Sequence, residues 1–165
     1  MLKGYSKFLD LLEKIEKLLL AVAVAVMLAV MVYQVVLRYI FSSANAWSEE
    51  LARYLFIFEV MIASAIAVRR NSHLQIDVLI NCLKPKMKCI FTIVSTLVGI
   101  AFLLLLLIYS AGLVQTGGSN ISVGLQIPMS VPYACVPVGV TLMILTSIEV
   151  VLKQIELLRK GDVEA

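Results

Sequence analysis

This chain has 165 residues, of which 61% are hydrophobic and 15% charged, and its mean hydropathy is +0.99. A soluble domain of this size cannot bury so much apolar surface, so these values exclude an ordinary soluble protein and favour a membrane protein. The net charge of +3 comes from basic residues that flank apolar segments. We therefore expect a lipid bilayer as the surroundings and no nucleic-acid partner.

Residues 2–17 carry apolar side chains at three- and four-residue spacing with lysines between them, which predicts an amphipathic helix. This helix either lies on the membrane surface or continues the first spanning helix. A span needs about 20 apolar residues, and four windows meet or approach that length: residues 18–40, 51–68, 90–114 and 129–152. The segments between them are too short to hold a separate core. The sequence predicts an all-α integral membrane protein, with residues 1–165 forming a single four-helix domain.

The second predicted span begins with a charged cluster. Ser48 is expected to cap the helix, with Glu49 and Glu50 in its first turn, where the helix dipole favours carboxylates. Arg53 follows these acids by four and three residues, so it can pair with both on one helix face. A capped and anchored helix start explains the cluster. Alternatively, Arg38 at the end of the first span joins either acid in a network that fixes helix or subunit packing.

Glu59 lies near the middle of the second span, where a charge costs about 2.5–3.5 kcal/mol on insertion scales. Arg53 lies on another side of the helix, and Arg69 is about 15 Å further along, so a partner must come from elsewhere. Ala63 and Ala67 share its stripe and would let another helix approach closely. Three interpretations remain open: a neutral hydrogen-bonded acid that stabilises packing, a coupling-ion site, or a contact with another subunit.

In the fourth span, Pro137 removes one backbone hydrogen bond, which predicts a kink near residues 133–137. Basic residues precede the first span, separate the second from the third, and follow the fourth. Residues 41–48 contain no basic side chain, and residues 115–128 contain no charge at all. Because basic loops remain in the cytoplasm, we expect both termini to be cytoplasmic.

The sequence carries no enzyme signature. His73 is the single histidine, and Cys82, Cys89 and Cys135 have no paired CxxC spacing. A zinc site or a haem held by two histidines from this chain is therefore not expected, and there is no phosphate-binding loop or nucleophile elbow. We predict no enzyme activity, no metal and no cofactor.

Three stretches together resemble the small membrane subunit of a tripartite ATP-independent periplasmic (TRAP) transporter. They are LRYIF at residues 37–41, WSEELARYLF at residues 47–56 and RRNSHLQIDVL at residues 69–79, with a looser match of IPMSVPYACVPVG at residues 127–139. The resemblance implies a bacterial inner-membrane importer, in which a periplasmic binding protein captures an organic acid. A large multi-span membrane subunit would move that acid with a sodium gradient, and this chain would be a scaffold packed against the large subunit.

Seven residues match motif positions, and the resemblance implies that they support packing or subunit contact: Arg38, Trp47, Glu49, Glu50, Arg53, His73 and Asp77. The chain departs from the pattern at Phe58, where the family often has Trp, at Ala63, where Gly is common, and at Glu59, where an apolar residue is usual. Glu59 therefore becomes a separate hypothesis, a polar contact with the large subunit.

The main alternative is a small dimeric proton-coupled exporter of the multidrug type that uses Glu59 as its exchanged carboxylate. The size of the chain and the number of helices permit this function. The outer Glu and Arg cluster and the motif that runs from Trp47 to His73 stand against it. A membrane-bound enzyme subunit is a third interpretation, which fails for lack of ligands.

Overall fold

The computed structural model describes residues 2–43, 45–70 and 85–160. In that part of the chain, all regular secondary structure is helical except for one isolated β-bridge. The long helices are α1 (Leu2–Ile40), α2 (Ala46–Arg69), α4 (Pro85–Gly117) and α6 (Cys135–Lys160), and a short helix α5 (Ser130–Tyr133) precedes α6. Each long helix contains a segment that is apolar and long enough to cross a bilayer. The predicted all-α membrane fold is therefore confirmed.

The first helix, α1, is continuous over 39 residues. At 1.5 Å per residue it is about 58 Å long, nearly twice the ~30 Å hydrocarbon core of a bilayer. Residues 2–17 therefore prolong the helix of the first predicted span without a break, and they carry most of the charged side chains of α1. The apolar remainder of α1 has enough length to cross the bilayer by itself.

The second helix begins earlier than the position of Ser48 suggested. Asn45 has an extended backbone (φ −119°, ψ 110°) and precedes Ala46, the first residue of α2. Ser48 lies in the first turn, and its Oγ donates to the carbonyl oxygen of Asn45 (3.1 Å). The prediction that Ser48 caps this helix is wrong, because the chain already enters the helical conformation at Ala46.

The kink expected in the last span is present as a break between α5 and α6. Tyr133 ends α5 and Cys135 begins α6, with Ala134 between them. Pro137 has no amide hydrogen to donate to the Tyr133 carbonyl oxygen, and its ring crowds that carbonyl. The predicted kink is confirmed.

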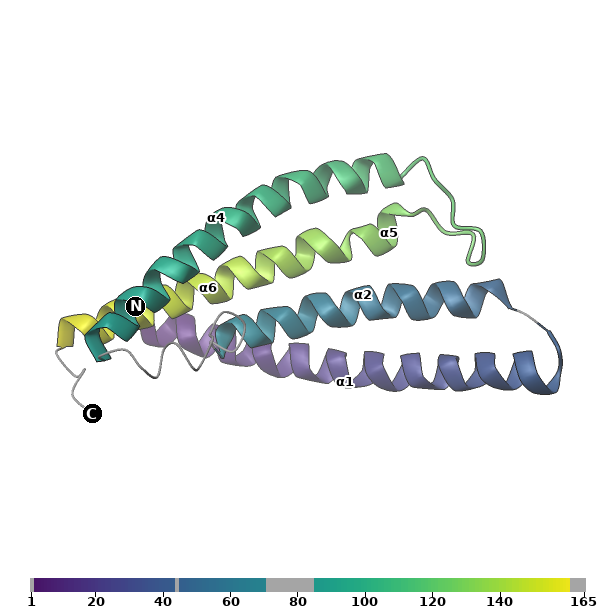
Figure 1. Cartoon of the computed structure of the whole chain (residues 1–165), viewed down its shortest axis with the longest axis horizontal. Helices are drawn as coiled ribbons and strands as arrows, with labels where there is room; N and C mark the ends of the chain where they lie inside the picture. Colours follow the sequence, from purple (N-terminus) through teal and green to yellow (C-terminus); the bar gives the residue numbers. More distant parts are fainter. Residues whose placement is uncertain (1, 44, 71–84, 161–165) are drawn as a thin grey trace.

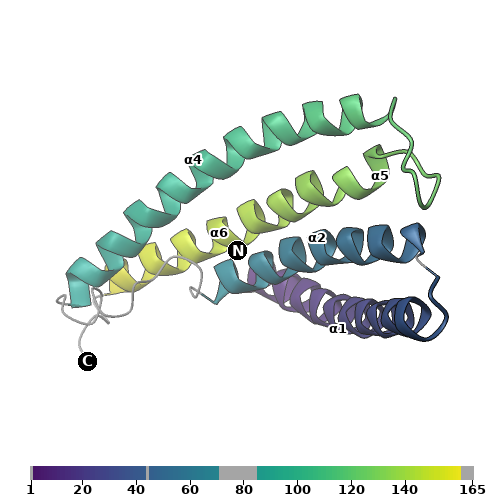
Figure 2. The ribbon, with the colours of Figure 1, turned by 45° about the vertical axis from the view of Figure 1, so that its right-hand side comes forward.

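The long helices form a row in the order α1, α2, α6, α4 (Figures 1 and 2). In the spanning segment of α6, 39% of the residues are buried, against 6% in α1, so α6 lies inside the row and α1 at its edge. The base is the end where α1 and α4 begin and α2 and α6 end. The tip is the opposite end, where α1 connects to α2 and the α4–α5 loop, residues 118–129, connects α4 to α5.

The core between the helices is small. Ala65 and Val68 of α2 pack with Met143 of α6, and partly buried side chains from α2, α4 and α6 surround them. Gly139 lets α6 approach α2 closely, since a Cβ at this position would lie 2.6 Å from the Cβ of Met61. Many large apolar side chains remain exposed along all the long helices. In a bilayer, these side chains contact lipid or a partner protein.

Candidate functional site

At the base, Arg69 connects three helices. It is the last residue of α2, and its side chain is only 7% exposed. Its Nε donates to Oε2 of Glu149 on α6 (2.8 Å), and its Nη2 donates to Oδ1 of Asp10 on α1 (2.6 Å). Its Nη1 donates to Oε2 of Glu13 and to the carbonyl oxygen of Leu9. Arg69, Asp10, Glu13 and Glu149 are termed the Arg69 clasp.

Further cations balance the acids of the clasp. Glu149, whose side chain is 1% exposed, also accepts from Nζ of Lys153 (2.7 Å). Glu13 also pairs with Lys17 and with Nη2 of Arg70 (3.2 Å). A buried ion pair holds its geometry when each charge has an opposite charge and hydrogen bonds nearby. The clasp meets this condition and fixes α1, α2 and α6 relative to one another.

At the tip, Glu50 anchors the α4–α5 loop to the start of α2. Its Oε2 accepts hydrogen bonds from Oγ of Ser122 (2.6 Å) and from the amides of Gly124 (2.8 Å) and Leu125 (2.9 Å). Its Oε1 accepts from the hydroxyl of Tyr54 (2.7 Å). One carboxylate thus serves donors from its own helix and from a loop distant in the sequence. Glu50, Tyr54, Ser122, Gly124 and Leu125 are termed the Glu50 knot.

The backbone of the α4–α5 loop is shaped for this contact. A Cβ at Gly124 would lie 2.7 Å from Oε2 of Glu50 and 2.9 Å from the carbonyl oxygen of Ala46, so only glycine fits there. Gln126 has a positive φ of 55°, and its side-chain amide donates to the carbonyl oxygen of Val123 (2.9 Å). The loop is therefore held in one shape by both its backbone and Glu50.

Glu59 has no such partner. It is 7% exposed, and its Oε1 is buried without a hydrogen bond to any described residue. Because α1 and α2 run antiparallel, ten residues back along α2 from Arg69 corresponds to ten residues forward along α1 from Glu13, which reaches Ala23. Ala23 is 6% exposed. Glu59 therefore faces protein, and helices of this chain supply its cover.

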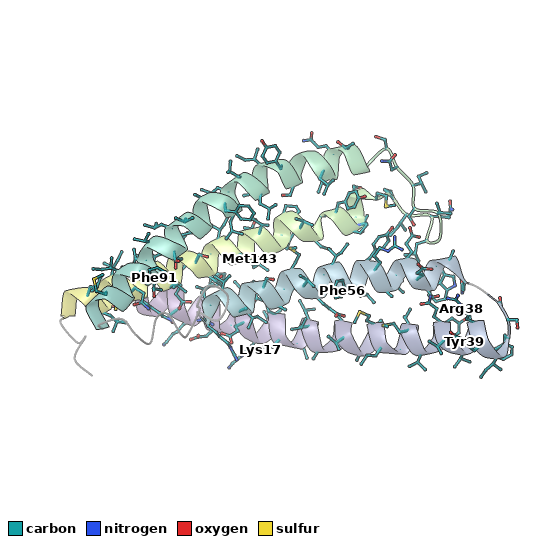
Figure 3. The ribbon with its side chains drawn as sticks, viewed as in Figure 1. Lys17, Arg38, Tyr39, Phe56, Phe91 and Met143 are labelled. Atoms are coloured by element: carbon teal, nitrogen blue, oxygen red, sulfur yellow. The ribbon has the colours of Figure 1, made fainter. Side chains whose placement is uncertain are left out.

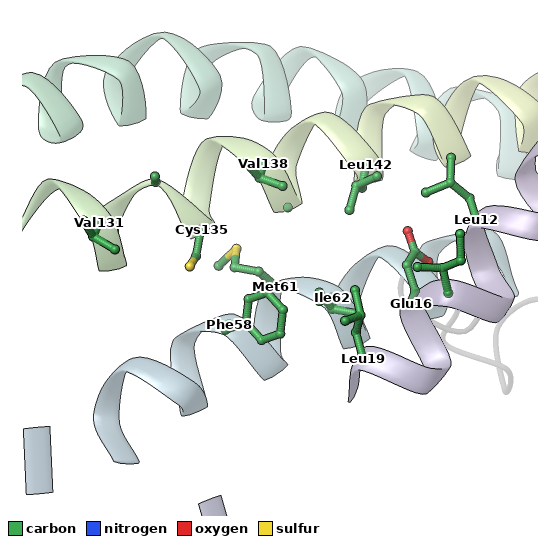
Figure 4. Close-up of a pocket in the computed structure, with 13 residues that line it drawn as sticks. Leu12, Glu16, Leu19, Phe58, Met61, Ile62, Val131, Cys135, Val138 and Leu142 are labelled. Carbon is green, nitrogen blue, oxygen red and sulfur yellow. The ribbon is translucent and has the colours of Figure 1, made fainter. Parts of the chain in front are cut away.

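An apolar groove runs between α1, α2 and the α5–α6 segment. It consists of two adjoining hollows with volumes of about 290 and 330 Å³, which share Phe58, Val131 and Cys135. The hollow nearer the base is bounded by α1, α2 and α6, and Figure 4 shows side chains from all three helices around it. The hollow nearer the tip is bounded by α2, α5 and the α4–α5 loop. Among the described residues that line the groove, Glu16 is the one charged side chain, and it is 5% exposed.

These elements are suited to holding helices and loops in place. Within residues 2–43, 45–70 and 85–160, no group of three or more His, Cys, Asp or Glu side chains could hold a metal ion. The thiols of Cys89 and Cys135 are free. The polar groups of the clasp and of the knot are used in contacts within the chain, so the described part offers two structural anchors and an apolar groove.

A family model described as the DctQ component of the tripartite ATP-independent periplasmic transporters matches residues 12–157. The matched range includes the Glu50 knot, the groove, and the clasp except Asp10. The chain belongs to this transporter family. The family is a transporter component, so the resemblance seen in the sequence is confirmed, and the chain is a multi-pass membrane protein.

Curated relatives are TRAP transporter permease proteins. The sialic acid TRAP transporter small permease protein SiaQ of Vibrio cholerae is 36% identical over 66 residues, which cover 40% of this chain and 38% of that protein. The C4-dicarboxylate TRAP transporter small permease protein DctQ of the same species is 28% identical over 106 residues, covering 64% and 46%. This chain thus spans less than half the length of these two relatives.

A third relative is much longer than this chain. The isethionate TRAP transporter permease protein DctMQ of Oleidesulfovibrio alaskensis is 24% identical over 155 residues. The alignment covers 89% of this chain but only 24% of that protein. In that relative, the region similar to this chain is therefore covalently joined to a much longer remainder.

The first two stretches of the TRAP motif, residues 37–41 and 47–56, lie on either side of the connection between α1 and α2. The ring of Trp47 packs against Tyr33 of α1 with centroids 5.8 Å apart. Glu49 pairs with Arg53 at 3.4 Å, as predicted, and both side chains are exposed. The prediction that Arg53 also pairs with Glu50 is wrong, because Glu50 turns toward the donors of the α4–α5 loop.

Other motif positions are less constrained. Arg38 is exposed near the tip (Figure 3), and among the described contacts it reaches neither Glu49 nor Glu50. The alternative network around Arg38 is therefore not formed within this chain. His73 and Asp77 lie outside the described residues, so their structural role stays a prediction.

Sequence reasoning missed the partners in both anchors. Glu149 is an acid inside the fourth predicted span, and the argument that singled out Glu59 applies equally to it. In the sequence, its partner Arg69 stands out only as a residue too far along the helix to pair with Glu59 and as one of the basic residues between the second and third spans. Ser122 and Gly124 gave no signal, because nothing local to a polar loop indicates a carboxylate from a distant helix.

Proposed function

We propose that this chain is the small membrane (scaffold) subunit of a TRAP transporter in a bacterial inner membrane, where it pairs with a large multi-span membrane subunit. With a periplasmic binding protein, the pair imports an organic acid driven by a sodium gradient. The observation that carries this proposal is the family match over residues 12–157.

Pairing with a large subunit is supported by the isethionate relative, where the region similar to this chain makes up 24% of a longer permease protein. The substrate class is supported by the names of the relatives, since sialic acid, C4-dicarboxylates and isethionate are all organic acids or their anions. In the described part of this chain, the polar clusters are occupied by internal contacts. A scaffold role therefore fits this chain, with the substrate and sodium sites in the large subunit.

The orientation proposed for the chain places the base in the cytoplasm. Basic residues gather there: at the start of α1, at the end of α2 and in the last turns of α6. Short segments rich in Lys and Arg remain on the cytoplasmic side of a membrane. The tip, with the Glu50 knot and the α4–α5 loop, then faces the periplasm, where the binding protein delivers its substrate.

The exporter alternative requires a carboxylate that is accessible to a transport pathway. Glu59 is only 7% exposed, because helices of this chain cover it. Membership of the DctQ component family also favours an importer subunit.

The proposal is tested by uptake into proteoliposomes. The large subunit is reconstituted with and without this chain, the binding protein is added outside, and labelled organic acids are supplied with or without an inward sodium gradient. We expect uptake when all three proteins and the gradient are present. Equal uptake without this chain, or uptake that does not depend on the sodium gradient, would contradict the proposal.

A further inference from the structure

We propose that the apolar groove between α1, α2 and the α5–α6 segment is the seat of a transmembrane helix of the large subunit. The inference rests on the proposed function. It adds the face of this chain, and the residues on that face, by which the two subunits meet.

Polar contacts outside the groove fix its shape. At the base, the Arg69 clasp ties α1 to α2 and α6, and the hydroxyl of Tyr5 donates to the carbonyl oxygen of Leu145 (2.9 Å). At the tip, the Glu50 knot holds the α4–α5 loop against α2. The side chains of the chain do not fill the space between these anchors. The groove is therefore formed by this chain alone.

The lining of the groove selects an apolar occupant. Ile15 (49% exposed) and Leu19 (46%) stand on the α1 side, and Val131 and Val138 (each 59%) stand on the side of α5 and α6. These side chains border a hollow and still remain about half exposed, so contacts within this chain cover only about half of their surface. Beside them, Ala134 is small and lets a neighbouring helix approach closely.

A protein helix fits this face better than a lipid chain does, because helix association in a bilayer depends on van der Waals packing into complementary surfaces. A concave surface made by several helices offers such packing. The isethionate relative aligns with 89% of this chain, so the groove-forming helices have counterparts in a single protein that also contains a large additional part. A permanent protein neighbour is therefore expected in the membrane.

A photo-crosslinking amino acid at Val138 tests the inference, with the same amino acid at Phe56 as a matched control. Val138 lines the groove and is 59% exposed. Phe56 is 57% exposed but lies two residues from the groove residue Phe58, or about 200° around α2, so its side chain points away from the groove. The tagged chain is produced together with the large subunit, irradiated in membranes and purified.

The expected result is a product with the combined mass of both subunits from Val138, and no such product from Phe56. If the two subunits co-purify but crosslink through Phe56, or if Val138 yields only lipid adducts, the groove is not the seat, although the proposed function still stands. If the large subunit does not co-purify with the unmodified chain, both the inference and the proposed function fail.

A second pair of variants gives an independent readout. Val138→Trp places a large ring at the groove, and Phe56→Trp places the same ring on another side. Because both positions are exposed, the chain alone should keep its yield and its monodisperse elution in detergent. We expect Val138→Trp to lose the large subunit during purification and Phe56→Trp to retain it. Equal retention by both variants would overturn the inference.

Discussion

The two ends of α2 each carry two adjacent residues of like charge, and in each pair one residue turns into the fold while the other remains exposed. At the tip, Glu50 enters the knot, whereas the side chain of Glu49 is 65% exposed. At the base, Arg69 enters the clasp with 7% exposure, whereas Arg70 is 58% exposed. Neighbours on a helix differ by about 100° in direction, so only one of each pair can face the other helices. Position around the helix thus decides which charge becomes an anchor.

The anchors also differ in chemistry. The clasp joins a guanidinium to carboxylates from two other helices, and Glu149 within it is almost fully buried. The knot joins a carboxylate to a serine hydroxyl, a tyrosine hydroxyl and two backbone amides. Loss of Arg69 would leave a buried charge with too little compensation, whereas loss of the Glu50 charge would weaken the hydrogen bonds of neutral donors. We therefore expect the base to be the more sensitive end.

The largest effect is expected from Arg69→Ala. Removing one partner of a buried ion pair destabilises a protein by about 3–5 kcal/mol, because the other charge stays buried. Thermal unfolding of the purified chain in detergent, followed by the fraction that stays monodisperse, measures this loss. Arg70→Ala is the matched control and should have a much smaller effect, since its side chain is 58% exposed. Equal losses of stability for both variants would mean that burial does not separate the role of Arg69 from that of Arg70.

Glu59→Leu tests a buried acid that lacks the contacts of both anchors. Its Oε1 has no hydrogen-bond partner among the described residues. An unsatisfied buried polar group costs about 1–3 kcal/mol, so the exchange should stabilise the chain by an amount of that order. The same unfolding assay measures the gain, and Glu59→Gln should give less of it because an amide remains polar. A clear loss of stability in Glu59→Leu would show that this carboxyl has a stabilising partner within the chain.

A smaller and more local effect is expected from Glu50→Gln. The uncharged amide is a weaker acceptor for Ser122, Gly124 and Leu125, so the α4–α5 loop should open more often while the helices remain folded. Hydrogen exchange followed by mass spectrometry should show faster exchange in peptides from residues 118–129. Glu49→Gln changes the neighbouring acid, which accepts a hydrogen bond from exposed Arg53, and should leave this exchange unchanged. Unchanged exchange in Glu50→Gln would show that the Glu50 knot does not hold the α4–α5 loop.

The smallest effect is expected from Arg53→Ala. The side chains of Arg53 and Glu49 are each 65% exposed, and their closest atoms are 3.4 Å apart. Exposed pairs at this spacing contribute about 0.3–0.5 kcal/mol in a helix. The unfolding temperature of the isolated chain should therefore change little. A loss as large as that of Arg69→Ala would mean that exposure does not separate anchors from surface charges in this protein.

Several features of the fold could be predicted from the sequence because they depend on local properties. Apolar run length predicted the four long helices, and the missing amide hydrogen of Pro137 predicted the break near Ala134. The order α1, α2, α6, α4 was not predictable, since hydropathy gives the number of spans but not which spans pack together. The inward turn of Arg69 and Glu50 depends on that packing, so it could not be predicted either. Glu149 could have been found, because an acid inside a span needs a partner.

Purification from native membranes tests whether this chain works as one of two membrane subunits. The tagged chain is extracted in mild detergent, and the proteins that accompany it are identified by mass spectrometry. The account predicts one large, multi-span membrane protein in a constant ratio to the chain. Recovery of this chain by itself, as a monomer or as a homodimer, would contradict it.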